Sequence, residues 1–129
     1  MNLKFIRSTF VVTTLFAACL ASATAAEASK EIEAISKKMV NALETSNYEN
    51  FIADGDAGWK KVPKPSFDNM ANGIGPRLKA GYTLSYLGEI KQGGAQVTLW
   101  RIAFTTGDDL LAKVAIKDGK VTSFGLPRI

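Results

Sequence analysis

Histidine is absent from this chain of 129 residues, and cysteine occurs only once, at Cys19. Histidine is the commonest general base and metal ligand in proteins, and cysteine is the usual thiol nucleophile. An intrachain disulfide needs two cysteines. These absences exclude histidine-based catalysis, a zinc site built on histidine or cysteine, and a disulfide scaffold. Carboxylates and tyrosine hydroxyls remain as candidate catalytic groups.

The N-terminal segment has the three parts of a secretory signal peptide. Lys4 and Arg7 give it a positive start, an apolar run extends over residues 10–20, and small residues fill positions 21–26. The apolar run is too short to span a membrane comfortably. The sequence therefore predicts a signal peptide at 1–26, cleaved after Ala25 or Ala26, a mature domain at 27–129 without a transmembrane segment, and a periplasmic or secreted location.

Cys19 raises the alternative of a lipid anchor. The stretch Phe16-Ala17-Ala18-Cys19 resembles the recognition site for lipidation, but leucine usually stands where Phe16 does. Small residues continue beyond the cysteine, and this favours ordinary cleavage downstream of it. The mature domain is then expected to contain no cysteine and to carry no lipid.

The mature charge gives no sign of nucleic-acid binding. Removing residues 1–26 takes away two basic residues and no acidic ones, so the net charge falls from +4 to +2. The adjacent lysines at 37–38 and 60–61 are isolated pairs without interleaved aromatic residues. We expect no nucleic-acid partner and no cofactor.

The first half of the mature domain has helical periodicity. Apolar residues recur at three- and four-residue steps between Glu27 and Ser46, with Ser29 as the predicted N-cap. A short helix is predicted at 48–53. A third helix is predicted to begin after Ser66 and to end or bend at Gly73, Gly75 and Pro76.

The last third, 82–126, is typical of four β-strands joined by three short turns. The turns contain Gly93-Gly94, Gly107 and Asp118-Gly119, and connections this short force neighbouring strands to be antiparallel. Alternation predicts that even-numbered residues, Ile90 included, face inward, and that Glu89 and Val121 face outward. Helices followed by such a meander indicate an α+β domain, with the helices packed on the aromatic face of the sheet.

This arrangement resembles the nuclear transport factor 2-like superfamily, also called cystatin-like or SnoaL-like. Within it, the chain resembles uncharacterised secreted bacterial proteins. The residues that carry this resemblance are Asn47–Phe51, Asp54–Asp56, Leu87–Glu89, Lys91–Gly94, Leu99-Trp100, Phe104, Leu111–Lys113 and Lys117–Val121. The resemblance covers essentially the whole mature domain. It implies a curved sheet wrapped around the long helix to form a cone-shaped pocket, and dimerisation through the outer face of the sheet.

Two sets of residues become candidates on this basis. Five aromatic side chains are core candidates first and pocket-lining ligand contacts second: Trp59, Tyr82, Tyr86, Trp100 and Phe104. Trp59 is expected above all to seal a small core. The outer face is half apolar, and the candidate homodimer contacts on it are Leu87, Leu99, Arg101 and Leu111, with Arg101 expected to pair with Glu89.

Two functions from different classes therefore remain open. The first is a non-catalytic secreted domain that binds a small apolar ligand or a protein partner in or around the pocket. The alternative is a SnoaL- or ketosteroid-isomerase-like enzyme, whose catalytic base would be Asp54, Asp56 or Asp68 at the pocket mouth, with a tyrosine hydroxyl as oxyanion donor. Asp54 and Asp56 flank Gly55 and are also typical turn residues. The sequence predicts no metal site.

Overall fold

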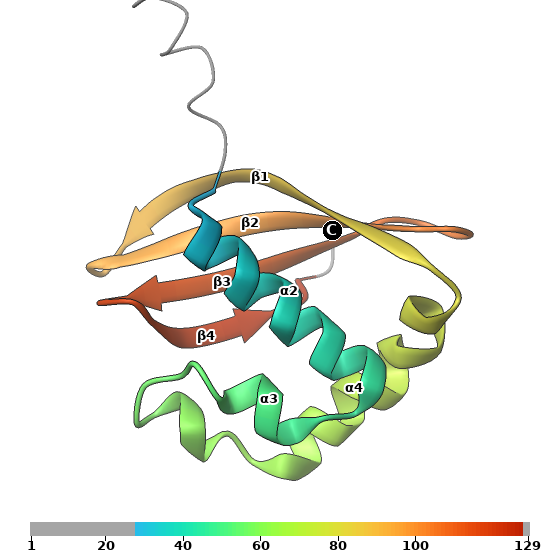
Figure 1. The fold of residues 1–129 in the computed structure, drawn as a ribbon, viewed down its shortest axis with the longest axis horizontal. Helices are drawn as coiled ribbons and strands as arrows, with labels where there is room; N and C mark the ends of the chain where they lie inside the picture. The colour runs from blue at the N-terminus through green and yellow to red at the C-terminus, as the bar shows by residue number, and fades with distance from the viewer. Residues whose placement is uncertain (1–27, 128–129) are drawn as a thin grey trace, which may run out of the picture.

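The computed structural model describes residues 28–127, so the predicted signal peptide with Cys19 lies outside the described residues. The helices come first and the strands follow. The elements are α2 (Lys30–Thr45), α3 (Tyr48–Ile52), the 3-10 turn η1 (Trp59–Lys61), α4 (Lys64–Lys79), β1 (Tyr82–Gln92), β2 (Ala95–Phe104), β3 (Leu110–Lys117) and β4 (Lys120–Gly125). The four strands form one antiparallel sheet in the order β1-β2-β3-β4. Figure 1 shows α2 lying across one face of this sheet, with α3 toward its β4 side and the end of α4 leading into β1. The α+β prediction with a four-stranded meander is confirmed.

Local sequence signals explain where α2 begins and ends. The Ser29 hydroxyl accepts a hydrogen bond from the backbone N–H of Ile32 at 3.2 Å, as an N-cap should. The helix ends at Ser46, which adopts the left-handed conformation, and Asn47 then caps α3 through the N–H of Asn50. The predicted start of the long helix is therefore confirmed.

The third helix is longer than its sequence predicted. It begins at Lys64 with Pro63 as its N-cap, so Ser66 is not the cap, and it continues through Gly75 and Pro76 to Lys79. Proline is tolerated in a first turn, and packing overrides the weak helix propensity of glycine near the end. A Cβ atom at Gly75 would lie 3.4 Å from the carbonyl oxygen of Leu43, an ordinary van der Waals contact, so α4 packs closely on α2 at this point.

The strand turns follow the predicted chemistry. Asp118 and Gly119 have φ values of 51° and 78°, which places both central residues of the β3–β4 turn in the left-handed region. Gly93 and Gly94 do the same between β1 and β2, with φ values of 59° and 80°. Both connections are two-residue hairpin turns, so neighbouring strands pair without a gap.

Two irregularities in the strand pairing change which side chains face the helices. In β1, the register shifts between Tyr86 and Gly88, so Tyr86 pairs with Trp100 but Gly88 pairs with Leu99. Leu87 is the extra residue of this β-bulge, and every later residue of β1 exchanges faces. A second shift beside Ala115 pairs Ile116 with Val121. Strict alternation was therefore wrong for Ile90, Glu89 and Val121.

The hydrophobic core lies between the helices and the inner face of the sheet. It contains Met39, Val40 and Leu43 from α2, Phe51 from α3, Trp59 from η1, Phe67, Ile74 and Leu78 from α4, and Trp100, Ile102, Val114, Val121 and Phe124 from the sheet. Burial of these side chains is the main force holding the two layers together. The opposite, outer face of the sheet carries Leu99, Arg101, Leu111 and Lys113.

Candidate functional site

Aromatic side chains pack together between the helices and the sheet, and one of the candidate pocket residues, Trp59, belongs to this cluster. Phe51 lies at its centre, with ring centroids 5.3 Å from Trp59, 5.0 Å from Phe67 and 5.3 Å from Phe124. The indole N–H of Trp59 donates to the carbonyl oxygen of Phe51 at 3.0 Å, and Trp59 is only 8% exposed. Aromatic pairs at these distances are in favourable packing contact. Trp59 thus has the environment of a residue that seals a core.

Trp100 is likewise held inside the core, by hydrogen bonds as well as by packing. Its indole N–H donates to the hydroxyl of Thr98 at 2.9 Å, and that hydroxyl donates to the carbonyl oxygen of Val114 at 2.9 Å. The ring packs on Tyr86 at a centroid distance of 5.2 Å. Every polar atom of this buried group is therefore satisfied within the protein.

The other candidate pocket residues lie at the margin of the core. Tyr82, Tyr86 and Phe104 are half-buried and pack against it. The Arg77 guanidinium carbon stands 3.9 Å from the centre of the Phe104 ring, a cation–π contact that ties α4 to β2. Burial raises the pKa of the Tyr82 hydroxyl, and the negative charge of Glu44 raises it further.

Asp54 and Asp56 have structural roles at the β4 edge of the sheet. The N–H of Val121 donates to the carbonyl oxygen of Asp54, and the N–H of Asp56 donates to the carbonyl oxygen of Val121, both at 2.9 Å. The Asp56 carboxylate accepts the backbone N–H of Trp59 at 2.8 Å, and that of Asp54 lies 3.4 Å from the Lys38 ammonium. Both residues therefore act as the turn and cap residues that their position beside Gly55 predicted.

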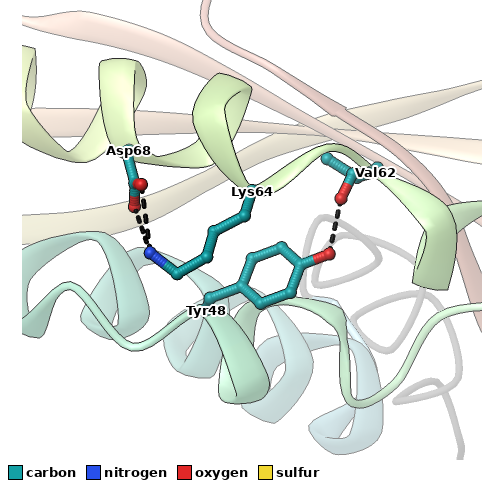
Figure 2. A network of polar contacts seen from close by, with 4 residues as sticks. All are labelled: Tyr48, Val62, Lys64 and Asp68. Atoms are coloured by element: carbon teal, nitrogen blue, oxygen red, sulfur yellow. Dashed lines mark hydrogen bonds and ion pairs between the residues drawn. The ribbon is translucent and has the colours of Figure 1, made fainter.

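Asp68 lies on the outside of α4, away from this loop. Its two carboxylate oxygens accept hydrogen bonds from the Lys64 ammonium at 3.1 and 3.0 Å, one turn earlier in the helix. Figure 2 shows this pair beside Tyr48, whose hydroxyl donates to the carbonyl oxygen of Val62. Asp68 is thus part of an exposed helix pair of the kind that supports helix structure.

One carboxylate that strict alternation had placed outward faces the helix side. Because of the bulge, Glu89 pairs with Thr98 on the inner face and accepts a hydrogen bond from the Gln96 amide. Its charge acts on Tyr86, whose pKa is raised mainly by burial and further by Glu89. The isolated glycine Gly88, with a φ of 144°, was the signal in the sequence, because glycine inside a strand often marks a bulge.

Glu89 contributes to a hollow of about 510 Å³ at the hairpin tips. Ile116, Ala95 and Gln96 form part of its lining, together with charged side chains of both signs, Glu89, Lys91, Lys117 and Asp118. The volume is in the range of small-molecule sites. However, most of its lining residues are exposed, and it lies at the end of the sheet rather than within the layers.

The outer face carries a second, smaller hollow, which is lined by three leucines and one ion pair. Leu87, Leu110 and Leu111 line it with Arg101 and Asp109, and its volume is about 220 Å³. Leu87 is 54% exposed, which is high for a leucine within a strand. The structure therefore brings together three of the four predicted dimer contacts, and Leu99 lies beside them, paired with Gly88.

Arg101 has a different partner from the one expected. Its guanidinium donates to the Asp109 carboxylate at 2.6 Å, whereas Glu89 lies on the opposite face. The bulge explains the error, because it moves Glu89 through the plane of the sheet. Both members of the observed pair remain largely exposed, with 55% and 42% of their side-chain surface accessible.

Within residues 28–127, no cluster of three or more carboxylates is arranged to hold a metal ion. The same residues include no helix of the length and apolarity needed to cross a membrane.

Comparison with known proteins identifies no family for this chain. No family model matches the chain, and no curated protein matches it. Among solved structures, it is similar to an uncharacterised cystatin-fold protein from Novosphingobium aromaticivorans, whose crystal structure was determined at 1.90 Å resolution. The two share 11% sequence identity with a TM-score of 0.43, over 78% of this chain and all of that one.

Proposed function

We propose that this chain is an exported, non-catalytic domain of the nuclear transport factor 2-like type, and that it acts by assembling with a second copy through the outer face of its sheet. The observation that carries the proposal is the apolar hollow at Leu87 and Leu111 on a sheet face that no described helix covers. The core between the helices and the sheet, in contrast, is built from buried aromatic and aliphatic side chains of the chain itself.

The outer face has the composition of a contact surface. Leu99 and Leu111 are only half-buried, and Leu87 projects from the bulge beside the hollow. Apolar surface of this kind on a small domain favours association, because covering it removes it from water. Arg101 and Asp109 at the rim supply polar contacts of the kind common at the margins of interfaces.

The hollow also suits a symmetric contact. Leu87 is both an exposed knob and one wall of the hollow, so a two-fold arrangement can insert Leu87 of each copy into the hollow of the other. Two-fold homodimers use the same surface on both subunits and are the commonest assemblies. A second copy is therefore the partner that we propose for this face.

The positions of the three candidate catalytic residues support a non-catalytic role. Asp54 and Asp56 close the β4 edge, and Asp68 pairs with Lys64 on the helix surface. Export is supported by the sequence of residues 1–26. N-terminal sequencing of the protein recovered outside the cytoplasm tests it, and a chain that still begins at Met1 would contradict it.

The assembly proposal is tested by the mass of the mature protein in solution. Leu111→Asp places a charge in the hollow and is expected to reduce the outer-face assembly, which light scattering after size exclusion would report. Thr83→Asp is the matched control, because Thr83 is exposed on the same face, opposite Ala103, and receives the same charge. Leu87→Asp, at a more exposed position, covers the case in which Leu111→Asp fails to fold. A mass unchanged in both leucine variants would refute the proposal.

A further inference from the structure

The two edges of the sheet differ in how many of their backbone N–H and C=O groups form hydrogen bonds within the protein. At the β4 edge, Gly55 forms a parallel bridge with Val121, and hydrogen bonds link Val121 to Asp54 and Asp56. At the other edge, β1 pairs with β2 alone among the described strands. β1 is also the longest strand, with 11 residues. An open edge presents unpaired N–H and C=O groups along its length, and these can pair with another strand.

The accessible part of this edge follows the bulge. Gly88 to Gln92 pair regularly with β2, and Glu89 to Gln92 are all exposed. Ile90, which is 49% exposed, projects on the outer face, while Glu89 and Lys91 project on the inner face. This stretch therefore offers a regular backbone, one apolar side chain and two opposite charges.

The order of these side chains is self-complementary. When two antiparallel strands are related by a two-fold axis through one residue, the residue before it lies opposite the residue after it in the other copy. With Ile90 on the axis, Glu89 of each copy faces Lys91 of the other, and the two isoleucines meet on the outer face. Opposite charges directly across two strands are stabilising, and like charges are destabilising. Within the described chain, no carboxylate forms an ion pair with Lys91.

We propose that β1 is a second self-association surface, at which β1 of another copy pairs antiparallel over residues 88–92 with Ile90 at the two-fold axis. The occupant is another copy of this chain, because Glu89-Ile90-Lys91 matches itself in that register. This contact differs from the proposed outer-face contact, because it uses the backbone edge of β1, whereas Leu111 lies near the start of β3 and contributes its side chain to the outer face. Together the two contacts would build an assembly larger than a dimer.

Bulges and charged residues also protect edges against pairing, and this alternative makes a different prediction. The bulge at Leu87 lies before the stretch and leaves 88–92 regular. Two charges of one sign would repel another copy, whereas Glu89 and Lys91 have opposite signs. A protective edge would make assembly insensitive to the order of these two charges, but a self-pairing edge depends on it.

The experiment therefore exchanges the two charges in steps. Glu89→Lys places lysine opposite Lys91 of the other copy, and Lys91→Glu places glutamate opposite Glu89. The double variant Glu89→Lys/Lys91→Glu restores both attractive pairs with the composition and net charge of the parent, so it is the matched control. All three variants are made in the mature wild-type chain and in the Leu111→Asp chain. In the Leu111→Asp chain the outer-face contact is weakened, so the self-association that remains measures pairing at the β1 edge.

Sedimentation equilibrium over a wide concentration range gives the dissociation constants. Each single variant is expected to weaken self-association through the edge by roughly tenfold or more, and the double variant is expected to restore it. The difference should shrink at high salt, which screens exposed charges. In parallel, hydrogen exchange is measured at several protein concentrations. Exchange of the backbone amides of residues 88–92 should slow as the protein concentration rises in the parent and in the double variant, but not in the single variants.

Two results would overturn the inference. One is equal self-association of the parent, the single variants and the double variant. That result is also expected if the β1 edge pairs with an extended segment of a different protein, because the purified chain would then not use this edge to bind itself. The other is a double variant as weak as the single ones, which would assign the loss to the side chains themselves and not to their pairing. Failure of the outer-face proposal is seen separately, as a Leu111→Asp protein that assembles like the wild type.

Discussion

The two edges of the sheet show how similar residues serve opposite purposes. At the β4 edge, Gly55 and the two aspartates beside it make hydrogen bonds within the protein. These bonds join the helical half of the chain to the sheet. At the β1 edge, the adjacent Gly88 and Glu89 follow a bulge and pair with β2 alone among the described strands. Polar residues beside glycine look alike in both stretches of sequence. The number of hydrogen bonds already made within the protein distinguishes them.

The difference extends to the packing behind each edge. Behind β4 stands the aromatic cluster of Phe51, Trp59 and Phe124, all at most 9% exposed. At the far end of β1, by contrast, there is a hollow with charged walls. Substitutions at the β4 edge should therefore change the stability of the domain, whereas substitutions at the β1 edge should mainly change its assembly.

Trp59→Ala should have the largest effect on stability. It removes the ring that contacts Phe51 and leaves the carbonyl oxygen of Phe51 without its indole donor. Replacing a buried aromatic residue with alanine costs about 3–5 kcal/mol. The free energy of unfolding, measured by urea denaturation, gives the value. A cost below about 1 kcal/mol, the usual size for a point mutation, would mean that the β4 edge is not held by this residue.

Gly55→Ala should have an intermediate effect at the same edge. A Cβ atom at Gly55 would lie 2.3 Å from Cδ1 of Trp59, so the loop or the ring must move. Overpacking of this kind typically costs about 1–3 kcal/mol. Gly58→Ala is the matched control, because its Cβ would meet only the Asp56 carboxylate at 3.5 Å and its φ is −69°. Equal costs for the two variants would show that the contact with Trp59 is not the cause.

Periodicity and turn chemistry were sufficient to predict most of the fold. The alternating stretches and the Asp118-Gly119 and Gly93-Gly94 turns predicted the meander, and Ser29 predicted the start of the long helix. The course of α4 was less predictable, because the part around Gly75 packs into the core through Ile74 and Leu78 beside residues of α2. Such a contact joins residues far apart in sequence and leaves no local signal.

The candidate site was less predictable than the fold for one physical reason. A single extra residue, Leu87, exchanges the faces of all later residues in β1, so the faces assigned to Glu89 and Ile90 and the partner assigned to Arg101 were wrong. The dimer candidates Leu87, Arg101 and Leu111 do lie together, because the exchange of faces begins only after Leu87 and the other two belong to other strands. Their role in assembly remains a prediction.

Ile90→Thr should have the smallest effect on stability, and it tests the β1 edge directly. Threonine keeps the branched Cβ that suits a strand and removes apolar surface from a side chain that is 49% exposed. At a protein concentration low enough to keep the chain monomeric, the free energy of unfolding should change by no more than about 0.5 kcal/mol. The same variant should weaken self-association in the Leu111→Asp chain, since it removes the apolar contact at the proposed axis. A large loss of monomer stability would show that Ile90 is covered by its own chain, and the contrast between the two edges would then fail.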